Sequence, residues 1–120
     1  MKKIITLITI MVFALSSFAQ TAKVEGTAAD LKKNISANFI EFVMPSEVTA
    51  ENIEKSAQYY TDYFTVGFNK ESKVAKITLL KGEEMERRVI TRFLLSTGVR
   101  GVNFEGADYT IMEFYSNFLE

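Results

Sequence analysis

The sequence predicts an α+β fold in which short strands form one sheet and two long helices pack against it. Two observations lead to this prediction. Several short segments alternate apolar and polar residues, as half-buried strands do. Longer segments repeat apolar residues every three or four positions, as amphipathic helices do. The segments follow the order strand, helix, strand, strand, helix, strand, which places both helices on one face of the sheet.

The first strand is predicted over residues 37–44, which are rich in aromatic and β-branched side chains. Alternation divides its side chains between two faces: Ile40, Phe42 and Met44 on one, and Phe39, Glu41 and Val43 on the other. Both faces are partly apolar. We therefore expect a central strand that is covered on both sides.

The first long helix follows Pro45, with Thr49 as its N-cap, and continues to about residue 64. Val48 and Ile53 are spaced to make a hydrophobic contact across the cap. Tyr59 and Tyr63 lie one turn apart on a flank of this helix. They are interpreted either as a stacking platform for a ligand or as residues that cover the edge of the core.

The second half of the chain predicts a hairpin, a second long helix and a fourth strand. The hairpin strands are residues 65–68 and 73–80, and the second directs Ala75, Ile77 and Leu79 toward the helices. The helix begins after Gly82, carries a main stripe of Met85, Val89 and Phe93, and ends at Gly98. The fourth strand covers residues 99–105.

A final short helix has the clearest local signal, because Thr110 and Glu113 form a capping box. Its apolar side chains include Phe114, Phe118 and Leu119, so it must dock on another surface. We expect it to cover the second face of the sheet. If it does not, that face is predicted to bind a partner or a second copy.

The composition excludes most familiar catalytic chemistry. The chain has 120 residues and contains neither cysteine nor histidine, so it has no thiolate nucleophile, no imidazole base and no thiolate zinc site. Carboxylates such as Glu41, Glu47 and Asp62 remain, but their spacing indicates no catalytic pair. The predicted protein is therefore not an enzyme and has no cofactor.

The N-terminus predicts export. Lys2 and Lys3 precede an apolar run that is too short to span a membrane, and residues 17–19 suit a signal peptidase. Cleavage after Ala19 places the protein in the periplasm or outside the cell. Loss of the two lysines leaves 12 of the 14 basic residues against 15 acidic ones, a net charge of about −3. This balance argues against nucleic acid, and against an anionic membrane after cleavage, as partners.

The predicted domains are a signal peptide at residues 1–19, a polar leader at 20–36 and one α+β domain at 37–120. The order of the elements resembles the ferredoxin-like fold and, within it, the small heavy-metal-associated domain. The signal peptide that ends Ser-Phe-Ala-Gln is similar to those of small exported proteins of the Bacteroidota. The heavy-metal-associated family places two metal-binding cysteines where this chain has residues 44–49, so no family ligand carries over.

Three functional hypotheses follow. The first is a non-catalytic binding domain for a protein partner or another copy of itself. The second is a weak metal or small-ligand carrier, using either Met44, Glu47 and Glu51 or the two tyrosines. The third, by fold analogy alone, is a protease inhibitor or folding chaperone. The residues predicted for a ligand or partner surface are Met44, Glu47, Tyr59, Tyr63, Phe114 and Phe118.

Overall fold

The computed structural model describes residues 20–120, and the predicted signal peptide lies outside the described residues. Six strands form one sheet in the order β3-β4-β2-β1-β5-β6. In chain order the strands are β1 (Thr21–Val24), β2 (Phe39–Val43), β3 (Phe64–Asn69), β4 (Val74–Leu79), β5 (Gly101–Phe104) and β6 (Ala107–Thr110). The α+β class predicted from the sequence is confirmed.

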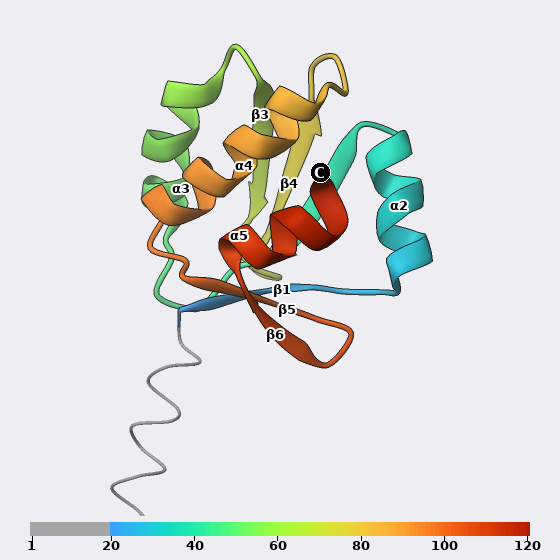
Figure 1. Cartoon of the computed structure of the whole chain (residues 1–120). Helices are drawn as coiled ribbons and strands as arrows, with labels where there is room; N and C mark the ends of the chain where they lie inside the picture. Colours follow the sequence, from blue (N-terminus) through green and yellow to red (C-terminus); the bar gives the residue numbers. More distant parts are fainter. Residues whose placement is uncertain (1–19) are drawn as a thin grey trace, which may run out of the picture.

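The helices connect these strands. They are α2 (Ala28–Ser36), α3 (Ala50–Ala57) with the 3₁₀ turn η1 (Gln58–Tyr60), α4 (Glu84–Ser96), and α5 (Ile111–Phe114), which continues into a π-helical turn (Tyr115–Leu119). Figure 1 shows α4 and α5 lying in front of the strands, with α2 at one side. No helix of residues 20–120 is long and apolar enough to span a membrane.

Residues 20–36 are part of the fold, which corrects the predicted leader. β1 lies inside the sheet, antiparallel to β2 and parallel to β5, and it pairs with β5 over four residues. Ala22 and Val24 are buried on it, and Leu31 of α2 is buried beside them. β1 has only two buried apolar residues, Ala22 and Val24. Two alternating apolar residues are too few to predict a strand within a polar stretch of sequence.

The strand order differs from the four-stranded order expected from the sequence. β3, β4 and β2 are neighbours, as a hairpin next to a central strand, but β1 separates β2 from β5. β6 pairs with β5 after a turn at Glu105 and Gly106, both of which have positive φ. The predicted fourth strand, residues 99–105, is found as β5, and the unpredicted strand β6 forms a hairpin with it.

The two faces of the sheet have different surroundings. The covered face carries the buried side chains that alternate along the strands, such as Ile40, Phe42, Ala75, Ile77 and Val102, together with the helices that pack on them. The open face carries the residues between them: Lys23, Glu41, Thr65, Gly67, Lys76 and Thr78 are exposed on it. No helix among residues 20–120 covers the open face.

This arrangement corrects two predictions. β2 is a central strand, but it is covered on one side only, because Glu41 is exposed and Phe39 and Val43 are half-buried. The C-terminal helix packs on the covered face, where the Phe114 ring contacts Phe42 at a centroid distance of 6.2 Å. The predicted cover of the second face is therefore absent from the described part of the chain.

Several local predictions are confirmed. Thr49 accepts a hydrogen bond from the Asn52 N–H as the N-cap of α3. Gly98 has a φ of +99° after α4, and the Thr110–Glu113 capping box is formed in both directions. In the main stripe of α4, Val89 and Phe93 are buried as predicted, but Met85 is exposed and Glu86 is buried beside it.

Candidate functional site

The loop after β2 serves the fold. Met44 and Val48 are buried, and the Lys73 side chain donates a hydrogen bond to the Val48 carbonyl at 3.3 Å. Met44 also donates its N–H to the Lys73 carbonyl at 2.8 Å. Glu47 is exposed. Because the Met44 thioether is enclosed in the core, it is not on the same surface as the Glu47 carboxylate.

No group of three or more acidic, histidine or cysteine residues within residues 20–120 is arranged to hold a metal ion. Glu51, the third predicted ligand, forms an ion pair with Lys55 at 3.3 Å one turn along α3. The sequence-predicted metal residues are therefore not brought together into one site.

The two predicted tyrosines have different environments. The helix ends at Ala57 and the chain tightens into η1, so Tyr59 and Tyr63 do not lie one turn apart on a single α-helix. Tyr59 is 80% exposed, whereas Tyr63 is half-buried against the core. Tyr60 is the residue that packs inward, stacking on Phe64 at 5.9 Å between ring centroids. Tyr59 alone remains free as a surface aromatic.

Phe114 and Phe118 belong to an aromatic cluster in the core. Phe114 is 1% exposed and contacts Phe104 at 5.8 Å, and Phe118 contacts Phe104 at 4.9 Å and Tyr109 at 5.3 Å. Edge-to-face contacts of this kind add to the burial of apolar area. Both residues were predicted for a partner surface. Phe114 is buried in the core, whereas Phe118 is half-buried and also lines the groove between α2 and the C-terminal turn.

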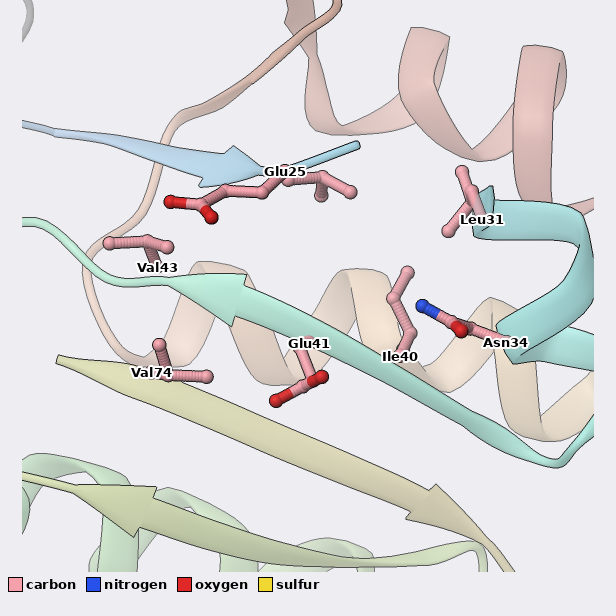
Figure 2. A pocket seen from close by; sticks show the side chains of 8 residues that line it. Glu25, Leu31, Asn34, Ile40, Glu41, Val43 and Val74 are labelled. Atoms are coloured by element: carbon pink, nitrogen blue, oxygen red, sulfur yellow. The ribbon is translucent and has the colours of Figure 1, made fainter. Parts of the chain in front are cut away.

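A small cavity of about 120 Å³ lies where β1 and β2 diverge. The two strands share a single register pair, Lys23 with Val43, because the chain leaves β1 at Val24 and turns at Gly26, which has a φ of +90°. Figure 2 shows the carboxylates of Glu25 and Glu41 beside this gap, with Asn34 at its α2 end. The two carboxylates and the amide have oxygen atoms of the kind that bind a cation, but no other acidic residue lines the cavity.

A larger groove of about 550 Å³ separates α2 from the C-terminal turn. Its apolar lining includes Leu31, Ile35 and Phe118, and Lys32 and Arg87 supply its positive charge. The Arg87 guanidinium already donates hydrogen bonds to the carbonyls of Leu119 and Gly82, at 2.5 and 3.1 Å. Arg87 therefore holds the C-terminal turn to the start of α4.

The outer edge of β3 combines free backbone groups with an uncharged sequence. β3 is the first strand of the sheet and pairs with β4 over all six residues without a bulge. Its sequence, Phe-Thr-Val-Gly-Phe-Asn, contains no charge and no proline. Natural edge strands are usually blunted by lysine, proline, bulges or a short length. β3 has none of these protections.

The hydrogen-bonding pattern shows which groups are free. The Leu80 N–H donates to the Tyr63 carbonyl, and bonded and non-bonded residues alternate along an antiparallel pair. Thr65 and Gly67 therefore direct their N–H and C=O groups toward β4. Phe64, Val66 and Phe68 direct theirs away from the sheet. Phe64 is only 1% exposed, so the accessible outward groups are those of Val66 and Phe68. We call the outer side of these three residues the β3 edge.

A shallow groove of about 350 Å³ runs beside the β3 edge. It is lined by α3 and the turn after it on one side and by β3 on the other: Glu54, Ala57, Gln58, Thr61, Phe64, Thr65 and Val66. Val66 and Phe68 are half-buried and their side chains lie on the helix side of the sheet. The groove thus offers apolar surface next to unpaired backbone groups.

No protein-family model, no curated protein and no solved structure matches this chain. The site must therefore be judged on its own geometry. Sequence reasoning identified the hairpin that contains β3 but did not single out the β3 edge. The available signal was the run of six uncharged residues between charged turns, which becomes informative only when β3 is known to be an edge strand.

Proposed function

We propose that this chain is an exported, non-catalytic domain that binds a protein partner or another copy of itself. The observation that supports this proposal most directly is the β3 edge, an uncharged edge strand beside an apolar groove. A strand added to an edge gains main-chain hydrogen bonds for affinity, and alternate side chains enter a neighbouring groove for specificity.

The composition of the edge supports binding over simple exposure to solvent. Unpaired N–H and C=O groups on a flat apolar strand pair readily with another chain, and proteins that do not use such an edge normally protect it. Here Val66 and Phe68 present both outward backbone groups and half-buried apolar side chains, whereas Phe64 is buried. The same two residues therefore supply affinity and selectivity.

Export is part of the proposal, and the position of β1 is compatible with it. β1 begins at Thr21, so cleavage after Ala19 leaves every strand of the sheet intact. In cells that produce the protein, the secreted or periplasmic fraction is expected to contain a chain whose N-terminal residue is Gln20. Full-length chain found only in the cytoplasm would contradict export.

The relation to the ferredoxin-like fold is also a proposal. β3, β4, β2 and β5 keep the relative order of that fold, and β1 is inserted between the last two. We therefore regard the sheet as a ferredoxin-like arrangement enlarged by β1 and β6. The proposed binding function depends on the edge and not on this classification.

A site-resolved photo-crosslink tests the function. A photoreactive phenylalanine analogue replaces Thr65, which is exposed on β3, and separately Lys32, which is exposed on α2. Irradiation of the producing cells is expected to yield a protein adduct from position 65 and none from position 32. Equal yields from both positions, or none from either, would contradict binding at the β3 edge.

A further inference from the structure

The groove between α2 and the C-terminal turn shares no lining residue with the groove beside the β3 edge. We call it the α2 groove. We propose that it binds a small amphipathic anion, an apolar body that carries one carboxylate. This inference goes beyond the proposed function and does not depend on it. Three observations carry it: the walls of the groove are supported separately, its uncovered surface is mainly apolar, and its cations have no carboxylate partner.

The two walls of the α2 groove are supported by different parts of the fold. α2 packs on β2, and Leu31 is its one buried residue. The chain leaves α2 at Asn38, which has a φ of +68° and accepts a hydrogen bond from the Leu79 N–H at 2.7 Å. The opposite wall, Tyr115–Leu119, packs on α4 and α5, and Figure 1 shows it beside α2. Because each wall has its own support, the space between them is formed without a ligand.

The uncovered part of the groove lining is mainly apolar. Ile35 of α2 and Phe118 of the C-terminal turn are half-buried, and Leu31 and Leu119 are buried beside them. Sites for small molecules have volumes of about 300–1,000 Å³ and apolar walls with a few polar groups. The α2 groove, at about 550 Å³, has this size and this composition. An apolar body that covers Ile35 and Phe118 removes their remaining surface from water, which favours binding.

The charges of the lining match a single negative charge. Lys32 and Arg87 contribute two cations and Glu120 contributes one carboxylate, so the lining has a net charge of +1. In the part of the chain that the structure describes, the one ion pair joins Lys55 to Glu51. Neither cation of the groove is therefore within 4.0 Å of a carboxylate, and both can pair with a bound anion.

Arg87 is held in place for this role. Its Nε donates to the Leu119 carbonyl at 2.5 Å and its Nη1 donates to the Gly82 carbonyl at 3.1 Å, and no hydrogen bond from Nη2 is found within residues 20–120. Two carbonyls thus orient the guanidinium but leave its charge and one nitrogen for a ligand. Lys32, exposed on α2, adds a second charge on a flexible stem. One remaining guanidinium nitrogen and a net charge of +1 suit a carboxylate better than a dianion.

An NMR titration with decanoate tests the site, because decanoate joins one carboxylate to an unbranched apolar chain. Saturable shifts are expected at Leu31, Ile35 and Phe118, with a Kd of roughly 1 mM or tighter. Hexanoate is shorter by four methylene groups and is expected to bind at least about tenfold more weakly. Decylammonium has the same chain length and a positive head, and it is expected to give no saturable shift at these residues.

Two matched pairs of variants assign the binding to the groove. Lys32→Glu reverses a charge in the lining and should weaken decanoate binding roughly tenfold, whereas Lys33→Glu, outside the lining, should change it less than about twofold. Ala28→Trp fills the groove and should abolish saturable binding, whereas Ala29→Trp, also outside the lining, should not. All four positions are exposed, so the variants should fold, and circular dichroism checks this.

Several results would overturn the inference. Shifts that do not saturate, or that lie outside the groove, would show non-specific association. Equal binding of decylammonium, or equal weakening by Lys32→Glu and Lys33→Glu, would show that the groove does not select an anion. Shifts at Ile35 and Phe118 when the free protein is concentrated would show that a second copy occupies the groove. None of these results bears on the β3 edge, which the photo-crosslink at position 65 tests separately.

Discussion

At the scale of single residues, two of the three capping boxes among residues 20–120, those with a threonine N-cap, link stability to pH. Asp30 accepts hydrogen bonds from the N–H and hydroxyl of Thr27, and Glu113 accepts one from the Thr110 N–H. These hydrogen bonds, from the backbone first and the threonine side chain second, hold the pKa of each carboxyl below its usual range. The stabilisation is therefore present above the ordinary carboxyl pKa and is lost as the pH falls through the lowered one.

Removing one hydroxyl should act on one cap only. In Thr27→Val the Asp30 carboxylate keeps the backbone donor but loses the side-chain donor, so its pKa is expected to rise part of the way to its usual range. The pKa of Glu113 should not change. A carboxyl-detected NMR titration of wild type and variant measures both groups together. An unchanged Asp30 pKa would show that the cap hydroxyl does not bind the carboxylate in solution.

Arg87 is the residue that joins the C-terminal turn to the rest of the molecule. Its hydrogen bonds to the carbonyls of Leu119 and Gly82 are charge-assisted and half-buried. Arg87→Met keeps an unbranched apolar stem and removes both bonds, so the free energy of unfolding is expected to fall by about 1.5–3 kcal/mol. Denaturant unfolding measures it. Arg92→Met, on an exposed position of the same helix, is the matched control, with an expected change within about 0.5 kcal/mol.

At the scale of elements, β1 is the part of the fold that differs most from expectation. Adjacent residues of this strand provide a matched test, because Ala22 is fully buried and Lys23 is exposed. Ala22→Asp places an unpaired carboxylate in the core and should cost several kcal/mol, or prevent folding. Lys23→Asp should change the free energy of unfolding by about 1 kcal/mol or less. If residues 20–36 were a leader outside the domain, both variants would unfold like the wild type.

The elements that could be predicted share a long or distinctive local pattern. The β3–β4 hairpin, α4 and the Thr110 cap each have several residues in agreement, and all three are confirmed. β1 has two inward residues, and α2 has one buried residue, Leu31. Their place in the fold is set by contacts with β2 and β5, which are distant in the sequence and cannot be predicted from a local pattern. Insertion of β1 beside β2 then decides the strand order.

The side of the sheet on which a helix docks also depends on these long-range contacts. The apolar stripe of the last helix correctly predicted that it docks. It did not predict where, because both sides of β2 contain apolar residues. The structure resolves this: Phe42 and Phe104 form the aromatic contacts with Phe114 on the covered face, leaving Phe39 and Val43 half-buried on the other. The candidate site was missed for the same reason, since an edge is defined only by the complete sheet.

At the scale of the whole molecule, all the helices described lie on one face of a sheet with two free edges, so protection of the backbone should vary along β3 in a definite pattern. Thr65 and Gly67 bond to β4, while Val66 and Phe68 point outward. In dilute protein the amides of Thr65 and Gly67 are expected to exchange slowly and those of Val66 and Phe68 rapidly. Amide hydrogen exchange followed by NMR resolves the four residues.

Raising the protein concentration tests whether the partner is another copy of the chain, and such pairing should change only the outward set. When two copies pair at the β3 edge, the Val66 and Phe68 amides become hydrogen-bonded and their exchange slows, whereas those of Thr65 and Gly67 already have partners. The amides of β6, at the opposite edge, provide the internal control and should keep their rates. Slow exchange at Val66 in dilute protein would show that another part of the chain occupies the edge. An alternation that persists at high concentration would show that the edge stays open, so one measurement reports both the architecture of the sheet and the fate of its edge.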